Sequence, residues 1–261
     1  MNWEKELLPY HQATDELKAK FENIALQFER VEKTTPIFSV EARVKTVPSI
    51  ISKAHRKKIP LDRVFGEIDD IAGLRIICRF VDDIHILTKL ISERDDMKIL
   101  LEKDFVNTMK PSGYRSYHFV VEYGLNTAFG KCSPRCEIQI RTLAMNFWAV
   151  TEHSLRYKYK GVIPETIKSR LVKAAEAAHA LDSEMNAIRD DILDAEKSAK
   201  SREEMVRDII HNIQELYGVS EMDAAQEMYN KFSTIWDVRN EEDLNHFYSD
   251  IQSIAQVHKI R

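Results

Sequence analysis

The stretch CEIQIRTLAMNFW, residues 136–148, changes its hydrophobic period halfway along. In its first half Glu137, Gln139 and Arg141 alternate with apolar residues, which is the two-residue period of a β-strand. From Thr142 the apolar spacing fits a helix that runs to about residue 157. The stretch therefore predicts a strand that leads directly into a helix. It also places a carboxylate, an amide and a guanidinium in a row on one face of that strand.

The rest of the chain contains further segments of both periods. Apolar steps of three and four predict helices over residues 3–31, 47–58, 82–94 and 164–200, with Asp82 capping the third. Runs rich in aromatic and β-branched residues predict strands over residues 73–81, 98–101, 114–123 and 137–141. A chain of 261 residues has room for one large domain, or for one domain with an appendage.

Composition narrows the class of protein. The chain is 44% hydrophobic and 31% charged, which is typical of a soluble globular protein. It lacks the pattern of a signal peptide, and no apolar run approaches the roughly 18 residues that cross a bilayer, so we expect a cytoplasmic protein without membrane association. The three cysteines form no disulfide or metal-binding pattern. The net charge of −4 excludes a strongly basic nucleic-acid binder on charge alone.

The C-terminal part of the sequence predicts helices only. Between residues 164 and 200 the apolar positions form a heptad seam, which needs a partner helix from residues 3–31 or from a second subunit. The seam consists of Ile167, Leu171, Ala174, Ala178, Leu181, Met185, Ile188 and Ile192. Residues 201–261 predict a helical extension, with a capping box at 201–204, a stop at Gly218, and further helices from about Ser220 and Asn240. We find no catalytic motif in this extension and expect a packing or oligomerisation appendage.

A basic segment without acidic residues spans residues 42–61. Arg43 and Lys45 project to one side of an extended lead-in. The face of the following helix then carries Ser49, Lys53 and Arg56. Charges aimed in one direction suit a small polyanion such as a triphosphate. The alternative is a solvated helix face, which is the more common role of such a charge run.

Asp70 lies just before the strand predicted over residues 73–81. A carboxylate at a strand edge is a common ligand of Mg²⁺, and Arg75 on the strand can lay its planar guanidinium on a purine ring. Taken alone, Asp70 is more often a turn cap and Arg75 a surface residue.

The segment KPSGYRSYH places a lysine, an aromatic ring and an imidazole close together. Tyr114, Ser116 and His118 share one strand face, and Lys110 precedes them across a turn. A ring for base stacking beside two groups for phosphate is typical of nucleotide sites. A single Tyr or His at such a position is more often a core residue.

The strand at residues 137–141 supplies the last candidates. Glu137 is able to hold Mg²⁺ together with Asp70, or to accept a proton from an attacking hydroxyl. Gln139 and Asn146 offer amides that can read a base edge. Four segments that each supply a different part of a nucleotide site favour a nucleotide-binding enzyme, and the chain lacks the P-loop and GxGxxG motifs of other nucleotide enzymes.

Four motifs together resemble the synthetase domain of the RelA/SpoT family, and specifically the small alarmone synthetases of the RelQ type: DIAGLRI, GYRSYH, EIQIRTLAMNFW and EHSLRYKYKG. The resemblance covers about residues 3–200. It implies an α+β fold with a mixed β-sheet flanked by helices, similar to nucleotidyltransferases. It also implies a GTP pyrophosphokinase of the stringent response, which moves the β,γ-diphosphate of ATP to the 3′-hydroxyl of GDP or GTP and releases AMP.

The same resemblance implies roles for the candidate residues. Asp70 and Glu137 would hold Mg²⁺, and Glu137 would also be the base for the 3′-hydroxyl. The ATP side would consist of Arg43, Lys45, Ser49, Lys53, Arg56 and Arg75, with the adenine between Arg43 and Arg75. The acceptor side would consist of Lys110, Tyr114, His118, Gln139 and Asn146, with Tyr114 stacked on guanine.

The resemblance implies a homotetramer with a central cleft that can bind alarmone. It also implies single-stranded RNA as a further ligand. This chain departs from the type after about residue 200. We therefore expect a synthetase domain at residues 1–200 and a helical extension at residues 201–261. The extension leaves open whether this chain forms the tetramer of the type. Three alternatives stay open: a toxic relative that pyrophosphorylates adenine nucleotides or tRNA, a non-catalytic nucleotide- or RNA-binding regulator, and a nucleotidyltransferase that releases pyrophosphate.

Overall fold

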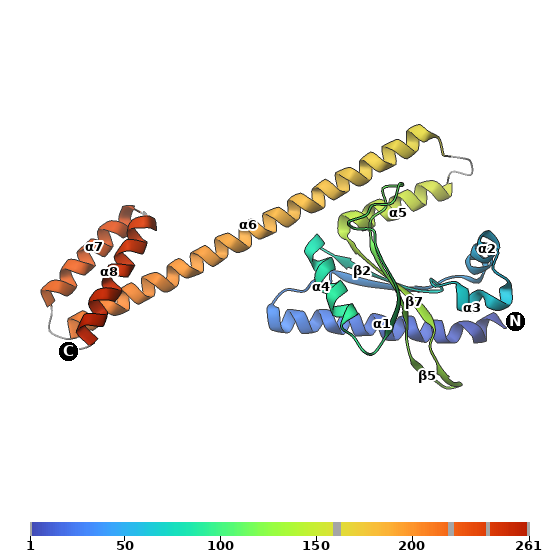
Figure 1. The fold of residues 1–261 in the computed structure, drawn as a ribbon, viewed down its shortest axis with the longest axis horizontal. Coiled ribbons are helices and arrows are strands. Elements are labelled where there is room, and N and C mark those ends of the chain that lie inside the picture. The colour runs from blue at the N-terminus through green and yellow to red at the C-terminus, as the bar shows by residue number, and fades with distance from the viewer. Residues whose placement is uncertain (1, 159–162, 219–221, 239–240, 260–261) are drawn as a thin grey trace. The chain divides into compact units, whose positions relative to one another are not determined.

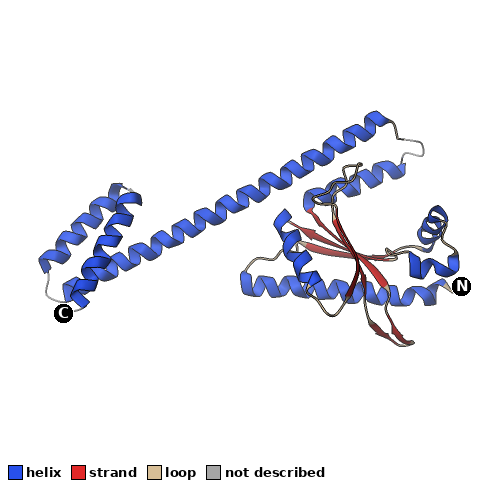
Figure 2. Cartoon of the chain, viewed as in Figure 1, coloured by secondary structure: helices blue, strands red, loops and turns tan. Residues whose placement is uncertain are grey.

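The computed structural model describes residues 2–158, 163–218, 222–238 and 241–259. The chain divides into two compact units, Met1–Ala187 and Ile188–Arg261. Each unit is described by itself below, and their helices and strands can be followed in Figures 1 and 2. The division falls inside one long helix, α6 (Glu165–Gly218), which supplies residues to both units.

The first unit is built on a five-stranded mixed sheet with the strand order β1-β2-β7-β4-β3. The strands are β1 (Ser39–Val44), β2 (Ala72–Cys78), β3 (Lys98–Asp104), β4 (Tyr117–Glu122) and β7 (Arg135–Thr142). β2 and β7 are parallel, and the other neighbouring strands are antiparallel. The helices around this sheet make the α+β fold that the sequence predicted.

One face of the sheet is the core, and the other face is polar. Helices α1 (Trp3–Glu32) and α4 (Val81–Ser92) bury their apolar stripes against the core face. Along β2, Leu74 and Ile76 are buried in this core, whereas Gly73 and Arg75 between them are directed to the other face. The alternation predicted for the strands is confirmed, and it leaves the polar side chains of β7 on the second face.

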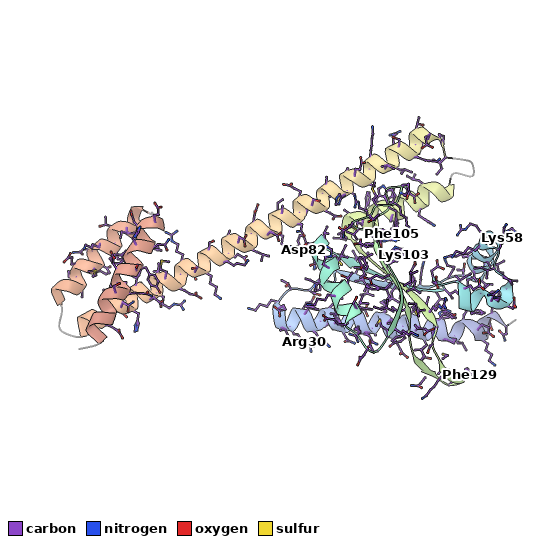
Figure 3. The ribbon with its side chains drawn as sticks, viewed as in Figure 1. Arg30, Lys58, Asp82, Lys103, Phe105 and Phe129 are labelled. Carbon is purple, nitrogen blue, oxygen red and sulfur yellow. The ribbon has the colours of Figure 1, made fainter. Side chains whose placement is uncertain are left out.

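Shorter elements complete the first unit. They are α2 (Val47–Lys57), the 3₁₀ turn η1 (Leu61–Arg63), α3 (Val64–Glu67), the hairpin strands β5 (Leu125–Thr127) and β6 (Gly130–Cys132), and α5 (Leu143–Lys158). The hairpin was not predicted, and its exposed Phe129 is labelled in Figure 3. Trp148 of α5 packs with Ala175 of α6 in a small second cluster, and its indole N–H donates to the Leu171 carbonyl at 2.9 Å.

The second unit consists of the later part of α6, α7 (Met222–Val238) and α8 (Glu241–Lys259). Its core is apolar and draws on all three helices: Ile209, Ile213, Phe232, Leu244, Phe247 and Ile251. The predicted stop of α6 at Gly218 is confirmed. The predicted starting points Ser220 and Asn240 lie outside the described residues.

Three of the sequence predictions are wrong for local reasons. Asp82 is not the cap of α4, because the N-cap is Phe80, whose backbone N–H donates to Asp83 Oδ2 at 3.0 Å. The strand predicted from Tyr114 starts only at Tyr117, because a turn precedes it in which the Gly113 N–H donates to the Lys110 carbonyl at 2.8 Å. The capping box at residues 201–204 marks no boundary, since α6 runs through it without a break and no helix breaker precedes it.

Only part of the heptad seam of α6 packs into the first unit. Leu171 and Ala178 of the seam pack against the cluster of Trp148 and Ala175, whereas Leu181 and Met185 further along the seam are 57% and 44% exposed. Because α1 buries its apolar stripe against the sheet, it does not supply the partner that the seam predicts. Among the described residues, no helix combines the length and the apolar character that crossing a bilayer requires.

Candidate active site

A row of side chains crosses the polar face of the sheet from one edge strand to the other. The strand register pairs Glu41 of β1 with Arg75 of β2, and Arg75 with Gln139 of β7. It then pairs Gln139 with His118 of β4, and His118 with Lys103 of β3. Directly opposed side chains of this kind interact across strands. The polar face of β7 is therefore the centre of a floor made by all five strands.

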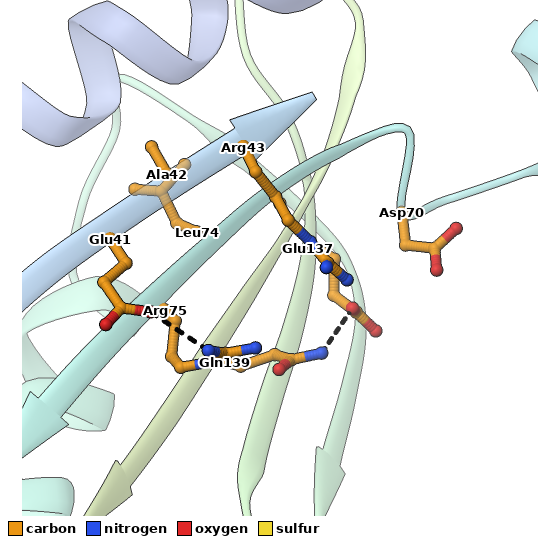
Figure 4. Close-up of a pocket in the computed structure, with 9 residues that line it drawn as sticks. Glu41, Ala42, Arg43, Asp70, Leu74, Arg75, Glu137 and Gln139 are labelled. Carbon is orange, nitrogen blue, oxygen red and sulfur yellow. Dashed lines mark hydrogen bonds and ion pairs between the residues drawn. The ribbon is translucent and has the colours of Figure 1, made fainter. Parts of the chain in front are cut away.

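A pocket with a cavity volume of about 110 Å³ lies on this floor over β1, β2 and β7 (Figure 4). Its polar lining residues are Glu41, Arg43, Asp70, Arg75, Glu137 and Gln139. All of these except Glu41 were predicted as site residues, and they come from three separate segments of the sequence. The fold thus brings together the groups that the sequence analysis had assigned to one nucleotide site.

Asp70 lies between two lysines of the basic segment. Its Oδ2 is 2.8 Å from Lys45 Nζ and 2.7 Å from Lys53 Nζ, while its buried Oδ1 has no hydrogen-bond partner. Burial raises the pKa of Asp70, but the two ammonium groups outweigh burial and hold that pKa below its ordinary value. The carboxylate is therefore ionised at neutral pH, and one of its oxygens is left for a further ligand.

Glu41 is a lining residue that the sequence analysis missed. Its Oε2 accepts a hydrogen bond from Arg75 Nη1 at 3.0 Å, whereas Arg75 Nε is buried without a partner. The signal was present, because Glu41 is two residues before Arg43 on the same strand and must share its face. The ion pair keeps the Arg75 guanidinium at the pocket wall, as Figure 4 shows.

Five side chains on the β4 and β7 side form a closed hydrogen-bonded ring, which we call the Glu137 circuit. The Tyr114 hydroxyl lies 2.8 Å from His118 Nε2, and His118 Nδ1 lies 3.2 Å from Glu137 Oε1. Gln139 Nε2 donates to Glu137 Oε2 at 2.7 Å. Arg141 Nη2 closes the ring by donating to Gln139 Oε1 at 2.6 Å and to the Tyr114 hydroxyl at 2.5 Å.

The circuit keeps Glu137 ionised although the residue is largely buried. Burial raises the pKa of Glu137, but His118 and Gln139 outweigh burial and hold that pKa below its ordinary value. An ionised Glu137 accepts hydrogen bonds from both His118 and Gln139. His118 therefore donates from Nδ1, and its Nε2 accepts a hydrogen bond from the Tyr114 hydroxyl. The arrangement provides a carboxylate that is fixed in orientation and ready to accept a proton.

Lys110 and an aromatic pair lie beside the circuit. Lys110 Nζ is 4.1 Å from the ring centroid of Phe105 and 4.8 Å from that of Tyr114. Burial lowers the pKa of the Lys110 ammonium. Phe105 also packs edge-on against His118, with the centroids 5.4 Å apart. Phe105, labelled in Figure 3, was not predicted, and no periodicity in its loop pointed to it.

Eight predicted residues do not line the pocket. Lys45 and Lys53 contact Asp70, Tyr114 and His118 belong to the Glu137 circuit, and Lys110 lies beside it. The other three are Ser49, Arg56 and Asn146. Ser49 is in the first turn of α2, where its hydroxyl accepts from Thr46 Oγ1 at 2.9 Å. Arg56 is exposed on the same helix. Asn146 on α5 has a buried Oδ1 without a hydrogen-bond partner. Asn146 is therefore open to a donor from a ligand, but its role stays a prediction.

Arg141 is the residue that the sequence analysis saw but did not use. It was placed on the same strand face as Glu137 and Gln139 and given no role. In the structure it is only 4% exposed and holds two members of the circuit at once. The signal was the position itself, because a charged residue at the inner end of a polar strand face has no reason to be there in a purely structural strand.

Asp70 and Glu137 are the carboxylates of the pocket that could hold a divalent cation. Among the described residues, no group of three or more His, Cys, Asp or Glu side chains makes a metal site on its own. Mg²⁺ is commonly held by one or two carboxylates together with phosphate oxygens. The unpartnered Oδ1 of Asp70 and the ionised Glu137 fit such a shared site.

Comparison with known proteins places the chain in a family. The sequence profile of the region found in RelA / SpoT proteins matches residues 42–162, which include every predicted site residue. The GTP pyrophosphokinase YjbM of Bacillus subtilis is 50% identical over 194 residues, covering 74% of this chain and 92% of that protein. A second one from the same organism, YwaC, is 38% identical over 193 residues, covering 73% and 92%.

Solved structures agree with this placement. Small alarmone synthetase 1 of Bacillus subtilis bound to its product pppGpp matches with a TM-score of 0.70 and 51% identity, covering 73% of this chain and 97% of that one. A GTP pyrophosphokinase family protein from Streptococcus pneumoniae matches with a TM-score of 0.70 and 48% identity, covering 75% and 96%. The chain belongs to the RelA/SpoT family of alarmone synthetases. The relatives whose lengths it covers almost fully are the small synthetases of that family.

Proposed function

We propose that the pocket and the Glu137 circuit together transfer the β,γ-diphosphate of ATP to the 3′-hydroxyl of GDP or GTP. The products are ppGpp or pppGpp, and AMP. The observation that carries this proposal is a largely buried, ionised Glu137 between a basic side with Lys45 and Lys53 and an aromatic side with Tyr114. The names of the relatives, GTP pyrophosphokinases and a synthetase with bound pppGpp, support the choice of substrates.

ATP occupies the basic side in this proposal. Arg43 and Arg75 line the pocket from neighbouring strands, and a guanidinium group can lie flat against the face of an adenine ring. Lys45, Ser49, Lys53 and Arg56 then face the phosphates. A relative with bound AMPCPP supports an adenine nucleotide at such a site.

The acceptor nucleotide occupies the other side. Its guanine stacks on Tyr114, and amides from Gln139 and Asn146 reach the base or the ribose. Lys110 and His118 face its phosphates. Lys110 is held beside two aromatic rings, and burial favours its pairing with an anion.

The proposed reaction transfers one proton, forms one bond and breaks one bond. The 3′-oxygen of the acceptor forms a bond to the β-phosphorus of ATP, and its proton passes to Glu137. The bond between the β-phosphorus and the oxygen that bridges it to the α-phosphate breaks, and AMP leaves with that oxygen. Such transfer depends mostly on positioning and on neutralising charge, which is the task of the basic groups around the pocket.

Mg²⁺ is the cofactor that the carboxylates fit. We place it on Asp70 Oδ1 and Glu137, where it would add positive charge next to the transferred diphosphate. Lys45 and Lys53 hold the other oxygen of Asp70 and so orient the carboxylate toward the pocket.

The test is one incubation of the protein with ATP, Mg²⁺ and either GDP or GTP, resolved by anion exchange. AMP that appears in equal amount with a more highly charged guanosine nucleotide supports the proposal and shows which acceptor is preferred. ADP or pyrophosphate as the second product contradicts it, and places the chain in another reaction class. Turnover only with adenine nucleotides or tRNA favours the toxic relative, and no turnover favours the binding-only regulator.

Assembly belongs to the same proposal. The exposed seam residues Leu181, Met185 and Ile188 fit a homo-oligomer, as expected from the family tetramer. We assign residues 201–261 to a helical appendage, and a cytoplasmic location to the chain. Deletion after Lys200 removes the second unit's core but no residue of the pocket, so we expect the truncated protein to keep its activity. An insoluble or inactive truncation contradicts the assignment of an appendage.

A further inference from the structure

We infer that Arg141 is the positioning residue of the acceptor half of the site: it orients both hydrogen-bond donors of Glu137 and tethers the ring of Tyr114. This inference rests on the proposed function, because it assigns Arg141 to the same reaction. Arg141 itself does not touch the reacting atoms. It acts through Gln139 on one side and through Tyr114 and His118 on the other.

Arg141 is a buried charge that a purely structural role does not explain. Its side chain is 4% exposed, and the partners it contacts are neutral: Gln139, the Tyr114 hydroxyl, and Ser116 Oγ at 3.3 Å. Burying a guanidinium is unfavourable unless hydrogen bonds offset the loss of water, and a well-packed apolar residue would be at least as stable in its place. The position therefore calls for a function that needs the guanidinium.

The first arm of Arg141 sets the orientation of an amide. Because Arg141 Nη2 occupies Gln139 Oε1, the NH₂ group of Gln139 must face Glu137 Oε2, where it donates at 2.7 Å. Without this anchor the amide is free to rotate and to present its oxygen to the carboxylate. Arg141 thus determines that Glu137 receives a donor at Oε2.

The second arm reaches the other oxygen of Glu137. The Tyr114 hydroxyl accepts from Arg141, so its own proton is directed to His118 Nε2. His118 then carries its proton on Nδ1 and presents it to Glu137 Oε1. Both arms start at one guanidinium nitrogen and end on the two oxygens of one carboxylate.

The same contact tethers the ring that stacks on the acceptor base. Arg141 Cζ lies 5.0 Å from the centroid of the Tyr114 ring, in addition to its bond with the hydroxyl. The two lysines of the donor side are held elsewhere, since Asp70 pairs with both Lys45 and Lys53. Loss of Arg141 should therefore affect the acceptor and the base, but not the binding of ATP.

The experiment compares the wild-type protein with Arg141→Met, Arg141→Lys and the control Arg94→Met. Arg94 is in the same unit, and its guanidinium is held by Asp96 rather than by the circuit. The KM for each nucleotide and kcat are measured at one pH. For Arg141→Met we expect an acceptor KM about tenfold higher or more and an unchanged ATP KM, because the ring of Tyr114 loses its tether. We also expect kcat to fall about tenfold or more, because Glu137 loses its oriented donors.

Second variants separate the two arms. In a Tyr114→Phe background, adding Arg141→Met should raise the acceptor KM little further, since the tether is already lost. In a Gln139→Leu background, adding Arg141→Met should lower kcat less than it does in the wild type. Full additivity in both backgrounds overturns the inference, because Arg141 would then act on neither partner.

The outcomes distinguish this inference from the proposed function. A wild-type protein that makes no AMP-linked guanosine nucleotide contradicts the proposed function itself. An active wild type with an unchanged acceptor KM and an unchanged kcat in Arg141→Met overturns the inference alone. If Arg141→Met does not fold by thermal unfolding, Arg141→Lys decides, because a lysine keeps the charge but cannot reproduce the planar fork. Wild-type kinetics in folded Arg141→Lys overturn the inference, and a raised acceptor KM with a lowered kcat and an unchanged ATP KM supports it.

Discussion

The two units of the chain bury different kinds of side chain. In the described part of the second unit, the buried residues are all apolar: Ile209, Ile213, Ala225, Phe232, Leu244, Phe247 and Ile251. In the first unit, the buried residues include Ser116, His118, Arg141, Thr142 and Asp182. Buried polar groups are unfavourable unless they are satisfied, and three of these, Ser116, His118 and Arg141, lie in or against the Glu137 circuit. The circuit therefore marks where this protein gives up stability for function.

The largest expected effect is on turnover, and it should arise from a substitution in the first unit but not from the same exchange in the second. Glu137→Gln keeps the shape of the side chain but removes the proton acceptor, so we expect turnover to fall by about 10²- to 10⁴-fold. Binding of a non-hydrolysable ATP analogue, measured by calorimetry, should be nearly unchanged. The same exchange at Glu204 on α6, in the second unit, is the control and should leave turnover intact. Retained turnover in Glu137→Gln removes this residue from the chemistry.

The next largest effect is on the stability of the second unit alone. Phe247 is 5% exposed in the apolar core of the second unit, and Phe247→Ala should cost about 3–5 kcal/mol of the free energy of unfolding of that unit. Hydrogen exchange of α8 amides reports this loss, while the amides of β7 keep their protection and turnover is unchanged. A parallel loss of protection in β7 would mean that the two units unfold together, and the comparison would fail.

A smaller effect concerns the turn that carries the acceptor residues. Gly113 has φ +92°, and a Cβ there would lie 2.6 Å from Ala175 Cβ on α6. Gly113→Ala should cost about 1–3 kcal/mol and raise the acceptor KM, because Lys110 and Tyr114 flank this turn. Gly130→Ala is the matched control, since Gly130 also has a positive φ, +114°, and nothing lies within 4 Å of the position that its new methyl group would take. Equal effects of the two substitutions would contradict the role of the contact with α6.

The smallest effect is the pH dependence of Asp70. Because the pKa of Asp70 is lowered in the folded state, the carboxylate stabilises the first unit above its unfolded pKa of about 3.9. That contribution is lost as the pH falls through the lower folded pKa. The difference in free energy of unfolding between wild type and Asp70→Asn should therefore shrink below about pH 4. The loss caused by Phe247→Ala changes no charge and should not vary over this range. A constant difference for Asp70→Asn would contradict the ion pairs with Lys45 and Lys53.

Much of the first unit could be predicted because its signals are local. The period of two in EIQIR places Glu137, Gln139 and Arg141 on one face whatever the rest of the chain does, and the helical spacing of residues 3–31 defines the stripe of α1. Predictions from local patterns failed where the same pattern occurs in two kinds of structure. The S-x-x-E pattern at residues 201–204 occurs inside helices as well as at their starts, and only the continuous backbone of α6 decides between them.

The rest of the site depends on the order of the strands in the sheet. Hydrophobic periodicity along the sequence does not predict that order. That Gln139 lies between Arg75 and His118 follows from β7 pairing with β2 on one side and with β4 on the other. The closure of the circuit by Arg141 follows from the same pairing together with the turn before β4. Phe105 packs on His118 from an irregular loop, and no sequence pattern marks such a contact.

The most direct test of the account replaces the acceptor rather than the protein. Wild-type protein with ATP and Mg²⁺ is given GTP in one reaction and 3′-deoxyguanosine triphosphate in the other, and AMP is measured together with the ³¹P spectrum of the product. The account predicts AMP and a new diphosphate on the 3′-oxygen with GTP, and no transfer with the deoxy compound, although that compound still competes with GTP for binding. Equal AMP formation with both acceptors would contradict the central claim, because the 3′-hydroxyl would then not be the group that attacks.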